Sequence, residues 1–126
     1  MFDGVYNNSE YWINGKKLGY HLSGYAPFYF DVTDYLNPNE DNRMTVRVDH
    51  SHYADSRWYT GSGIYRDVKM IVTDRLHIPV WGTFVTTPVV TDKYAKVNNQ
   101  ITVRNSYSEP RTAVVEIVYK DNKGNI

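Results

Sequence analysis

The sequence predicts an all-β protein. Its apolar residues recur with a period of two rather than 3.6, which is typical of strands with one buried face. Aromatic residues make up 15% of the chain and twelve of them are tyrosines, which suits the pleated surface of a sheet. A hydrophobic content of 41% over 126 residues is enough for a β-type core. The absence of cysteine excludes disulfides and thiolate chemistry.

The clearest local prediction is a hairpin over residues 9–21. Two alternating runs flank Asn14 and Gly15, and this pair favours a type I′ turn because both residues tolerate a positive φ. After the hairpin we expect a strand over 28–32, a helical turn over 33–36 begun by Thr33 or Asp34, and a turn over 37–42. A strand over 44–48 should follow, with Met44, Val46 and Val48 inward. A loop over 50–63 and a strand over 64–72 complete the elements expected before residue 73.

A change of pattern over residues 73–79 predicts a domain boundary. Polar turn residues occur there, and a new series of strands follows. We therefore expect one domain over 1–75 and a second over 76–126, whose strand spacing suggests an immunoglobulin-like β-sandwich. The strands expected in the second domain lie over 80–86, 95–105 and 112–120, with a hairpin turn in 121–126.

The charge balance argues against two classes of partner. Fourteen basic and fourteen acidic residues give no net charge, so general attraction to nucleic acid or to an anionic membrane is not expected. No apolar run approaches the roughly 20 residues of a membrane span. The first ten residues contain neither a basic nor an apolar leader region, so we expect no signal peptide in this chain.

The predicted loop over 50–63 is the most informative stretch for function. Loops of this length are usually functional or disordered, and its aromatic residues and arginine argue against disorder. Asp49, His50 and His52 also occur close together, but two spaced histidines without a distant third ligand are usually incidental. We therefore predict no metal site.

Several ordered motifs occur in this chain: FDGVYNNSEYWINGKKLGYHLSGYAPFYFDVTDYL, NRMTVRVD and SRWYTGSGIYRDVKM, all within residues 2–75, and HIPVWGTFVTTP in the remainder. Together they resemble glycoside hydrolase family 2, most closely its β-galactosidase-like members from gut-type bacteria. The resemblance implies part of a jelly-roll (galactose-binding-like) sugar-binding β-sandwich over 1–75, followed by part of an immunoglobulin-like β-sandwich over 76–126. In this family a TIM barrel with the two catalytic glutamates follows.

The resemblance implies that this chain alone is inactive. A retaining glycosidase needs two carboxylates roughly 5–5.5 Å apart, and the family keeps both on the barrel. We therefore assign no catalytic residue and expect no cofactor. Four glutamates are expected to be solvated surface charges: Glu10, Glu40, Glu109 and Glu116.

The resemblance also implies that the loop over 54–63 reaches toward the barrel mouth. In the family a carboxylate next to the loop tryptophan can hold substrate hydroxyls, whereas here Ser56 and Arg57 precede Trp58. The candidate substrate contacts are Asp55, Arg57, Trp58 and Tyr59. Alternatively, Trp58 anchors the loop at the seam between domains and Arg57 pairs with an acid. Gly61 and Gly63 are expected to let the backbone turn back into a strand.

Three functions remain open at this point. The first is a non-catalytic portion of a β-galactosidase-like hydrolase, with a β-galactoside-like carbohydrate and the rest of the enzyme, including its barrel, as partners. The others are a stand-alone carbohydrate-binding module and a structural or interaction fragment. Incomplete sandwiches leave hydrophobic edges, so we expect the isolated chain either to associate, for example into an oligomer, or to need its missing neighbours. The resemblance leaves a bacterial periplasmic or secreted location open.

Overall fold

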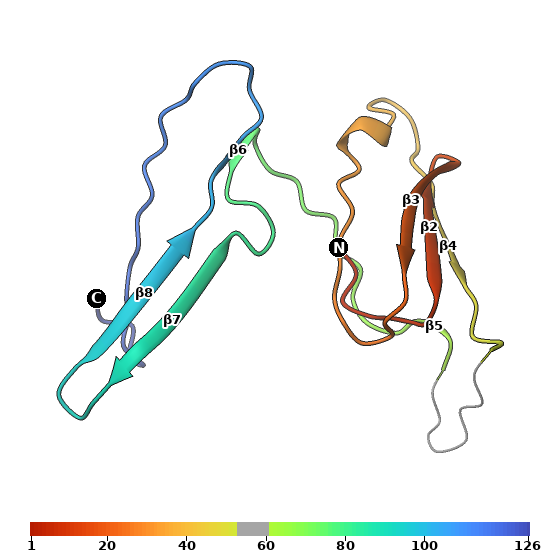
Figure 1. The fold of residues 1–126 in the computed structure, drawn as a ribbon. Helices are drawn as coiled ribbons and strands as arrows, with labels where there is room; N and C mark the ends of the chain where they lie inside the picture. The colour runs from red at the N-terminus through yellow and green to blue at the C-terminus, as the bar shows by residue number, and fades with distance from the viewer. Residues whose placement is uncertain (53–60) are drawn as a thin grey trace. The chain divides into compact units, whose positions relative to one another are not determined.

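The computed structural model describes residues 1–52 and 61–126, which are built of short strands (Figure 1). The chain divides into two compact units, Met1–Ile71 and Val72–Ile126. Among the described residues, helical structure is limited to one 3-10 turn, η1 (Thr33–Tyr35). The predicted all-β class is therefore confirmed.

Unit 1 is organised around a three-stranded antiparallel sheet with the order β3-β2-β4. Its strands are β2 (Ser9–Ile13), β3 (Lys16–His21) and β4 (Met44–Val48). A second ladder joins β1 (Val5–Tyr6) to β5 (Gly63–Ile64) in antiparallel register. Strands far apart in sequence are thus brought together around β2.

The predicted hairpin turn is confirmed. Asn14 has a φ of 50° and Gly15 a φ of 79°, the two positive values that a type I′ turn requires. The Asn14 side chain also ties the hairpin to a distant loop. Its Nδ2 donates to the Asn42 side chain at 2.7 Å and to the Tyr35 carbonyl at 3.0 Å, while its Oδ1 accepts from the Arg43 amide at 2.9 Å.

The short helical turn forms where expected, but its side-chain cap differs from the prediction. Neither Thr33 nor Asp34 starts it as a cap, because Val32 occupies the N-cap position without a side-chain hydrogen bond. Asp31 supplies the local acceptor instead. Its carboxylate accepts from the Thr33 amide at 3.1 Å and from the Thr33 hydroxyl at 2.6 Å.

The core of unit 1 lies on one face of the sheet. Along β2 the residues alternate between buried and half-buried, as a strand with one covered face must. Aromatic rings dominate the packing, with Phe2 stacked on Phe28 at 5.2 Å and Tyr11 edge-on to Phe28 at 5.1 Å. The buried hydrophobic residues are Phe2, Val5, Tyr11, Ile13 and Phe28, and those packed against the core are Leu18, Phe30, Val46 and Val48.

Two predicted strands of the first part are wrong in extent. Residues 28–32 contribute only a bridge from Phe28 to Phe2, and residues 64–72 contribute β5 and a bridge from Val68 to Phe2. The alternating pattern places Phe28 on a covered face, and Phe28 is indeed buried. A ladder needs a continuous neighbour, however, and the short segment around Phe2 supplies hydrogen bonds at single positions.

Unit 2 contains two separate antiparallel ladders. Strand β6 (Leu76–His77) pairs with β9 (Arg104–Asn105), and β7 (Thr83–Val90) pairs with β8 (Ala95–Ile101). The strand predicted over 80–86 starts later, because Gly82 closes a turn onto the Pro79 carbonyl. The strand predicted over 95–105 is interrupted after Ile101, so its last residues pair with a different strand.

The strand predicted over 112–120 is also wrong, since no described residue of this segment enters a ladder. The segment is instead held to β8 by a side-chain contact in which Asn99 donates to the Tyr119 hydroxyl. Val114 is 93% exposed. Alternating apolar residues give strand propensity, but a strand also needs a partner for its backbone groups.

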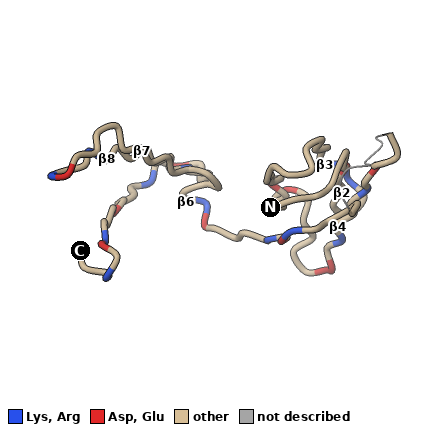
Figure 2. Tube along the Cα trace, turned by 90° about the horizontal axis from the view of Figure 1, so that it is seen from below, with Lys and Arg blue, Asp and Glu red and all other residues tan. Residues whose placement is uncertain are grey.

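Charged residues of both signs are interspersed along each unit, as Figure 2 shows. This matches the formal net charge of zero. The described part of the chain contains no helix of the length and apolar character needed to cross a membrane.

Candidate functional site

The two ends of the predicted substrate loop meet at a side-chain hydrogen bond. His50 follows β4, Ser62 precedes β5, and His50 Nδ1 lies 2.8 Å from Ser62 Oγ. Next to this contact, Tyr6 pairs with Gly63 in the β1–β5 ladder. The entry and exit of the loop are therefore fixed to neighbouring points on unit 1.

The Tyr6 ring packs beneath this loop base. It lies edge-on to His50 at 5.0 Å and edge-on to Tyr25 at 5.5 Å. Gly24 permits this packing, because a Cβ on it would lie only 2.2 Å from Tyr6 Cδ2. Gly63 has a φ of 110°, so the predicted backbone role of this glycine is confirmed.

The predicted substrate contacts fall outside the described residues. Asp55, Arg57, Trp58 and Tyr59 all lie within 53–60, so their contacts stay predictions. Gly61 is described and has open space around its Cα. The structure thus describes the base of the loop but not the side chains proposed to touch the substrate.

Two buried polar atoms of unit 1 were not singled out from the sequence. Asn7 Oδ1 and His21 Nε2 are inaccessible to solvent and have no hydrogen-bond partner among the described residues. The His21 ring is stacked on Phe28 at 4.0 Å. The sequence signal for Asn7 was ambiguous, because an Asn-Asn pair after a strand is equally typical of a turn.

The histidine pair considered for a metal is used differently. His50 contacts Ser62, and no group of three or more potential metal ligands occurs among residues 1–52 and 61–126.

A network of ion pairs covers the face of the sheet opposite the core. Glu10 on β2 is bound by Lys17 from β3 and by Arg47 from β4, the latter at 3.2 Å. Arg47 also lies 3.4 Å from the Asp49 carboxylate. Lys17 lies over the Trp12 ring at 5.6 Å, so Trp12 faces charged groups instead of the core. Glu10 is therefore a surface carboxylate, as predicted, but a paired one.

Two carboxyl groups on this face have a lowered pKa, for different reasons. The pKa of Glu10 is lowered mainly by the hydrogen bond from Lys17, with the nearby Lys17 and Arg47 charges adding to it. The pKa of Asp49 is lowered mainly by hydrogen bonds from the hydroxyl and the amide of Ser51. Both carboxyl groups therefore stay ionised at lower pH than an unperturbed carboxyl group would.

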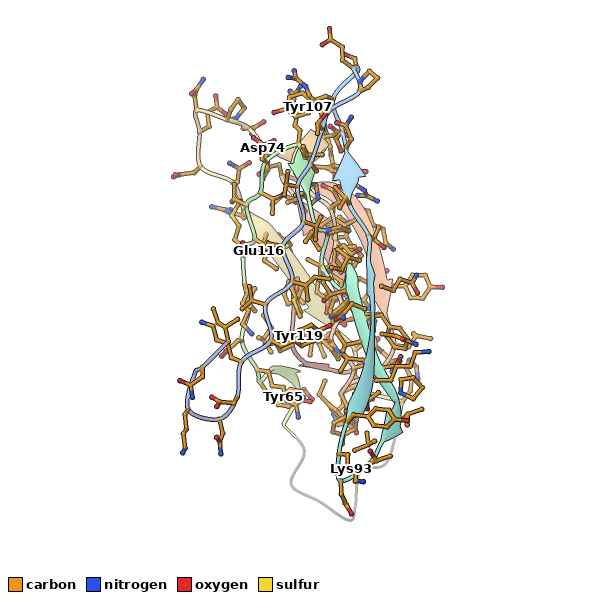
Figure 3. The ribbon with its side chains drawn as sticks, turned by 90° about the vertical axis from the view of Figure 1, so that its left-hand side faces the viewer. Tyr65, Asp74, Lys93, Tyr107, Glu116 and Tyr119 are labelled. Carbon is orange, nitrogen blue, oxygen red and sulfur yellow. The ribbon has the colours of Figure 1, made fainter. Side chains whose placement is uncertain are left out.

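Unit 2 contains a further polar cluster around Tyr107. The Tyr107 hydroxyl donates to Asp74 at 3.0 Å (Figure 3), and Arg111 lies over its ring at 4.7 Å. The pKa of Asp74 is lowered, first by the Leu76 amide and then by Tyr107, whereas the pKa of Tyr107 is raised by its bond to Asp74. The cluster joins the start of unit 2 to the turn after β9.

Comparison with known proteins places these observations in a family. Residues 1–74 match the family model described as "Glycosyl hydrolases family 2, sugar binding domain". The chain belongs to glycosyl hydrolase family 2. A family 2 beta-galactosidase of Bacteroides ovatus is 43% identical over 123 residues, which are 98% of this chain and 14% of that protein.

Other family 2 proteins also match this chain. A beta-glucuronidase of Bacteroides fragilis is 31% identical over 130 residues, covering 95% of this chain and 19% of that protein. The crystal structure of a beta-glycosidase from Bacteroides vulgatus matches with a TM-score of 0.74 at 40% identity, over 86% of this chain and 14% of the other. A family 2 member from Bacteroides cellulosilyticus matches with a TM-score of 0.71 at 42% identity, over 83% of this chain and 14% of the other. The chain thus spans only a small part of the length of these relatives.

Proposed function

We propose that this chain is a non-catalytic portion of a β-galactosidase-like family 2 hydrolase. In this proposal residues up to about 75 belong to the sugar-binding jelly roll, and residues 76–126 begin the immunoglobulin-like sandwich. Both scaffold a catalytic barrel located elsewhere in the enzyme. The observation that carries the proposal is the family match over residues 1–74, together with the short share of each relative that the chain covers.

The same proposal gives the loop over 54–63 a part in substrate binding. Support comes from the base of the loop, where His50 contacts Ser62 and Tyr6 packs against His50. A base fixed in this way lowers the entropy lost when the loop side chains become ordered around a ligand. In the proposal Asp55 and Arg57 hydrogen-bond sugar hydroxyls, and the faces of Trp58 and Tyr59 contact the C–H side of the ring.

The proposal is tested by kinetics on the full-length enzyme that carries this chain. Asp55→Ala and Arg57→Ala should each lower kcat/KM for a β-galactoside about tenfold, the usual loss for one hydrogen bond from a charged group. The matched controls are Asp92→Ala and Arg104→Ala, which make the same changes at exposed positions of unit 2. All four variants should keep the melting temperature. Unaltered kinetics for both loop variants would show that Asp55 and Arg57 do not contact the substrate.

A further inference from the structure

The turn between β2 and β3 contains a residue pair that can react with itself. In an Asn-Gly sequence the backbone nitrogen of the glycine can attack the side-chain carboxamide carbon of the asparagine, because glycine has no Cβ to hinder the approach. Asn14 and Gly15 are the only such pair in the sequence. No atom of the described residues lies within 4 Å of the position that a Cβ on Gly15 would take. Neighbouring side chains therefore do not block the attack.

Three hydrogen bonds oppose this reaction by holding the Asn14 carboxamide. Its Nδ2 donates to the Tyr35 carbonyl at 3.0 Å and to Asn42 Oδ1 at 2.7 Å, and its Oδ1 accepts from the Arg43 amide at 2.9 Å. The partners all lie between η1 and β4, at the same end of unit 1 as the turn (Figure 1). Attack makes the planar carboxamide tetrahedral, so these bonds must be distorted or broken. The fold therefore protects Asn14.

Asn42 is itself fixed in one orientation. Its Oδ1 also accepts from the Asn37 amide at 2.8 Å, and its Nδ2 donates to the Asn37 and Glu40 carbonyls at 2.9 and 3.0 Å. Exchanging the two ends of the Asn42 carboxamide would place an NH₂ group against the Asn37 N–H and an oxygen against two carbonyls. The atom of Asn42 that faces Asn14 therefore has to be an acceptor.

The product of the reaction does not fit these partners. A carboxylate at position 14 can still accept from the Arg43 amide, but it has no hydrogen to donate. One of its oxygens would face the Tyr35 carbonyl and Asn42 Oδ1, where Nδ2 donates in the amide form. Oxygen would then meet oxygen at both contacts. Conversion of Asn14 to an acid therefore separates the turn from the segment between η1 and β4.

We propose that Asn14 is a deamidation site that is protected by its three hydrogen bonds, and that its conversion irreversibly releases the segment between η1 and β4 from the β2–β3 turn. The Gly15 amide nitrogen loses its proton and attacks Asn14 Cγ, the Cγ–Nδ2 bond breaks and ammonia leaves. Water then opens the succinimide to aspartate or isoaspartate. The proposal is independent of the proposed function, because it uses contacts within unit 1 alone.

The first experiment compares the folded and the urea-unfolded 126-residue chain during incubation at mildly alkaline pH. Peptide mass spectrometry quantifies aspartate and isoaspartate at position 14, and protection of the β2 amides from hydrogen exchange verifies the folded sample. Deamidation should be at least about tenfold faster in the unfolded chain, because the folded chain reacts only through its open fraction. Equal rates in the two samples would overturn the proposal.

The second experiment removes one partner of Asn14. Asn42→Ala should speed deamidation of the folded chain about tenfold, because the open state becomes more populated. Asn39→Ala is the matched control in the same turn, since the Asn39 side chain has no hydrogen bond to a described residue. If Asn42→Ala lowers the protection of the β2 amides, urea below the unfolding midpoint replaces it and should raise the rate in the parent chain. Equal rates for the two variants, or a rate insensitive to this urea, would overturn the proposal.

The third experiment tests the release itself with Asn14→Asp, which places the product carboxylate in the turn. Hydrogen exchange of the Asn37 amide, which donates to Asn42 Oδ1, should become about tenfold faster. Asn39→Asp adds the same charge to the neighbouring turn and should leave this exchange unchanged. Unchanged exchange of the Asn37 amide in Asn14→Asp, or an equal acceleration in Asn39→Asp, would overturn the proposed release.

Discussion

Ser9 and Tyr11 offer a direct test of how the core of unit 1 is held together. Ser9 is 1% exposed and Tyr11 fully buried, and the Tyr11 hydroxyl donates to Ser9 Oγ at 2.6 Å. Ser9 Oγ in turn donates to the His21 carbonyl at 3.1 Å. The chain of hydrogen bonds therefore runs in one direction, from Tyr11 through Ser9 to β3.

This direction makes the two single substitutions unequal. Tyr11→Phe removes the first donor but leaves the Ser9 to His21 bond intact, so it should cost about 1 kcal/mol of unfolding free energy. Ser9→Ala leaves the buried Tyr11 hydroxyl without its acceptor and should cost about 2 kcal/mol. In the double variant no hydroxyl is stranded, so its cost should fall short of the sum by about 1 kcal/mol.

Native-state hydrogen exchange of the β2 amides is the suitable assay, because it reports on unit 1 separately from unit 2. A loss of about 2 kcal/mol should speed exchange of the most protected amides roughly 30-fold in Ser9→Ala. Ser106→Ala, at an exposed position of unit 2, is the control and should leave these amides unchanged. Equal effects of the two single variants, with an additive double variant, would refute the directional hydrogen-bond chain.

Two further predictions concern the loop base and the outer face. Gly24→Ala places a Cβ against the Tyr6 ring and should lower the free energy of unfolding by about 1–3 kcal/mol, which exchange of the β1 amides measures. Gly61→Ala is the control, because its Cβ meets open space and should change this exchange little. Equal effects of the two variants would contradict the packing of Tyr6 against Gly24. Because the folded pKa of Glu10 is lowered, its ion pairs stabilise the fold fully above the ordinary value of 4.5 and lose this contribution as pH falls below it. Glu10→Gln should therefore lower the urea midpoint near pH 7 and converge with the parent chain near pH 3, and an equal deficit at both pH values would count against this linkage.

Much of unit 1 could be predicted because its signals are local. The Asn14-Gly15 pair carries its own turn geometry, and the strand over 44–48 has the predicted bounds. The loop flanked by His50 and Ser62 could be recognised by its loss of periodicity. The contact between these two residues could not, because neither residue type specifies a partner twelve positions away.

The sequence by itself determined the all-β class, the hairpin and the family, since each depends on neighbouring residues or on motifs in order. Only the tertiary structure decided which alternating runs become strands. Residues 28–32 and 112–120 have the pattern, yet their backbone groups find no continuous neighbour among the described residues. It also decided that Glu10, Tyr20 and Arg47 share one face, because strand register places side chains from three strands together and register is a property of the whole sheet.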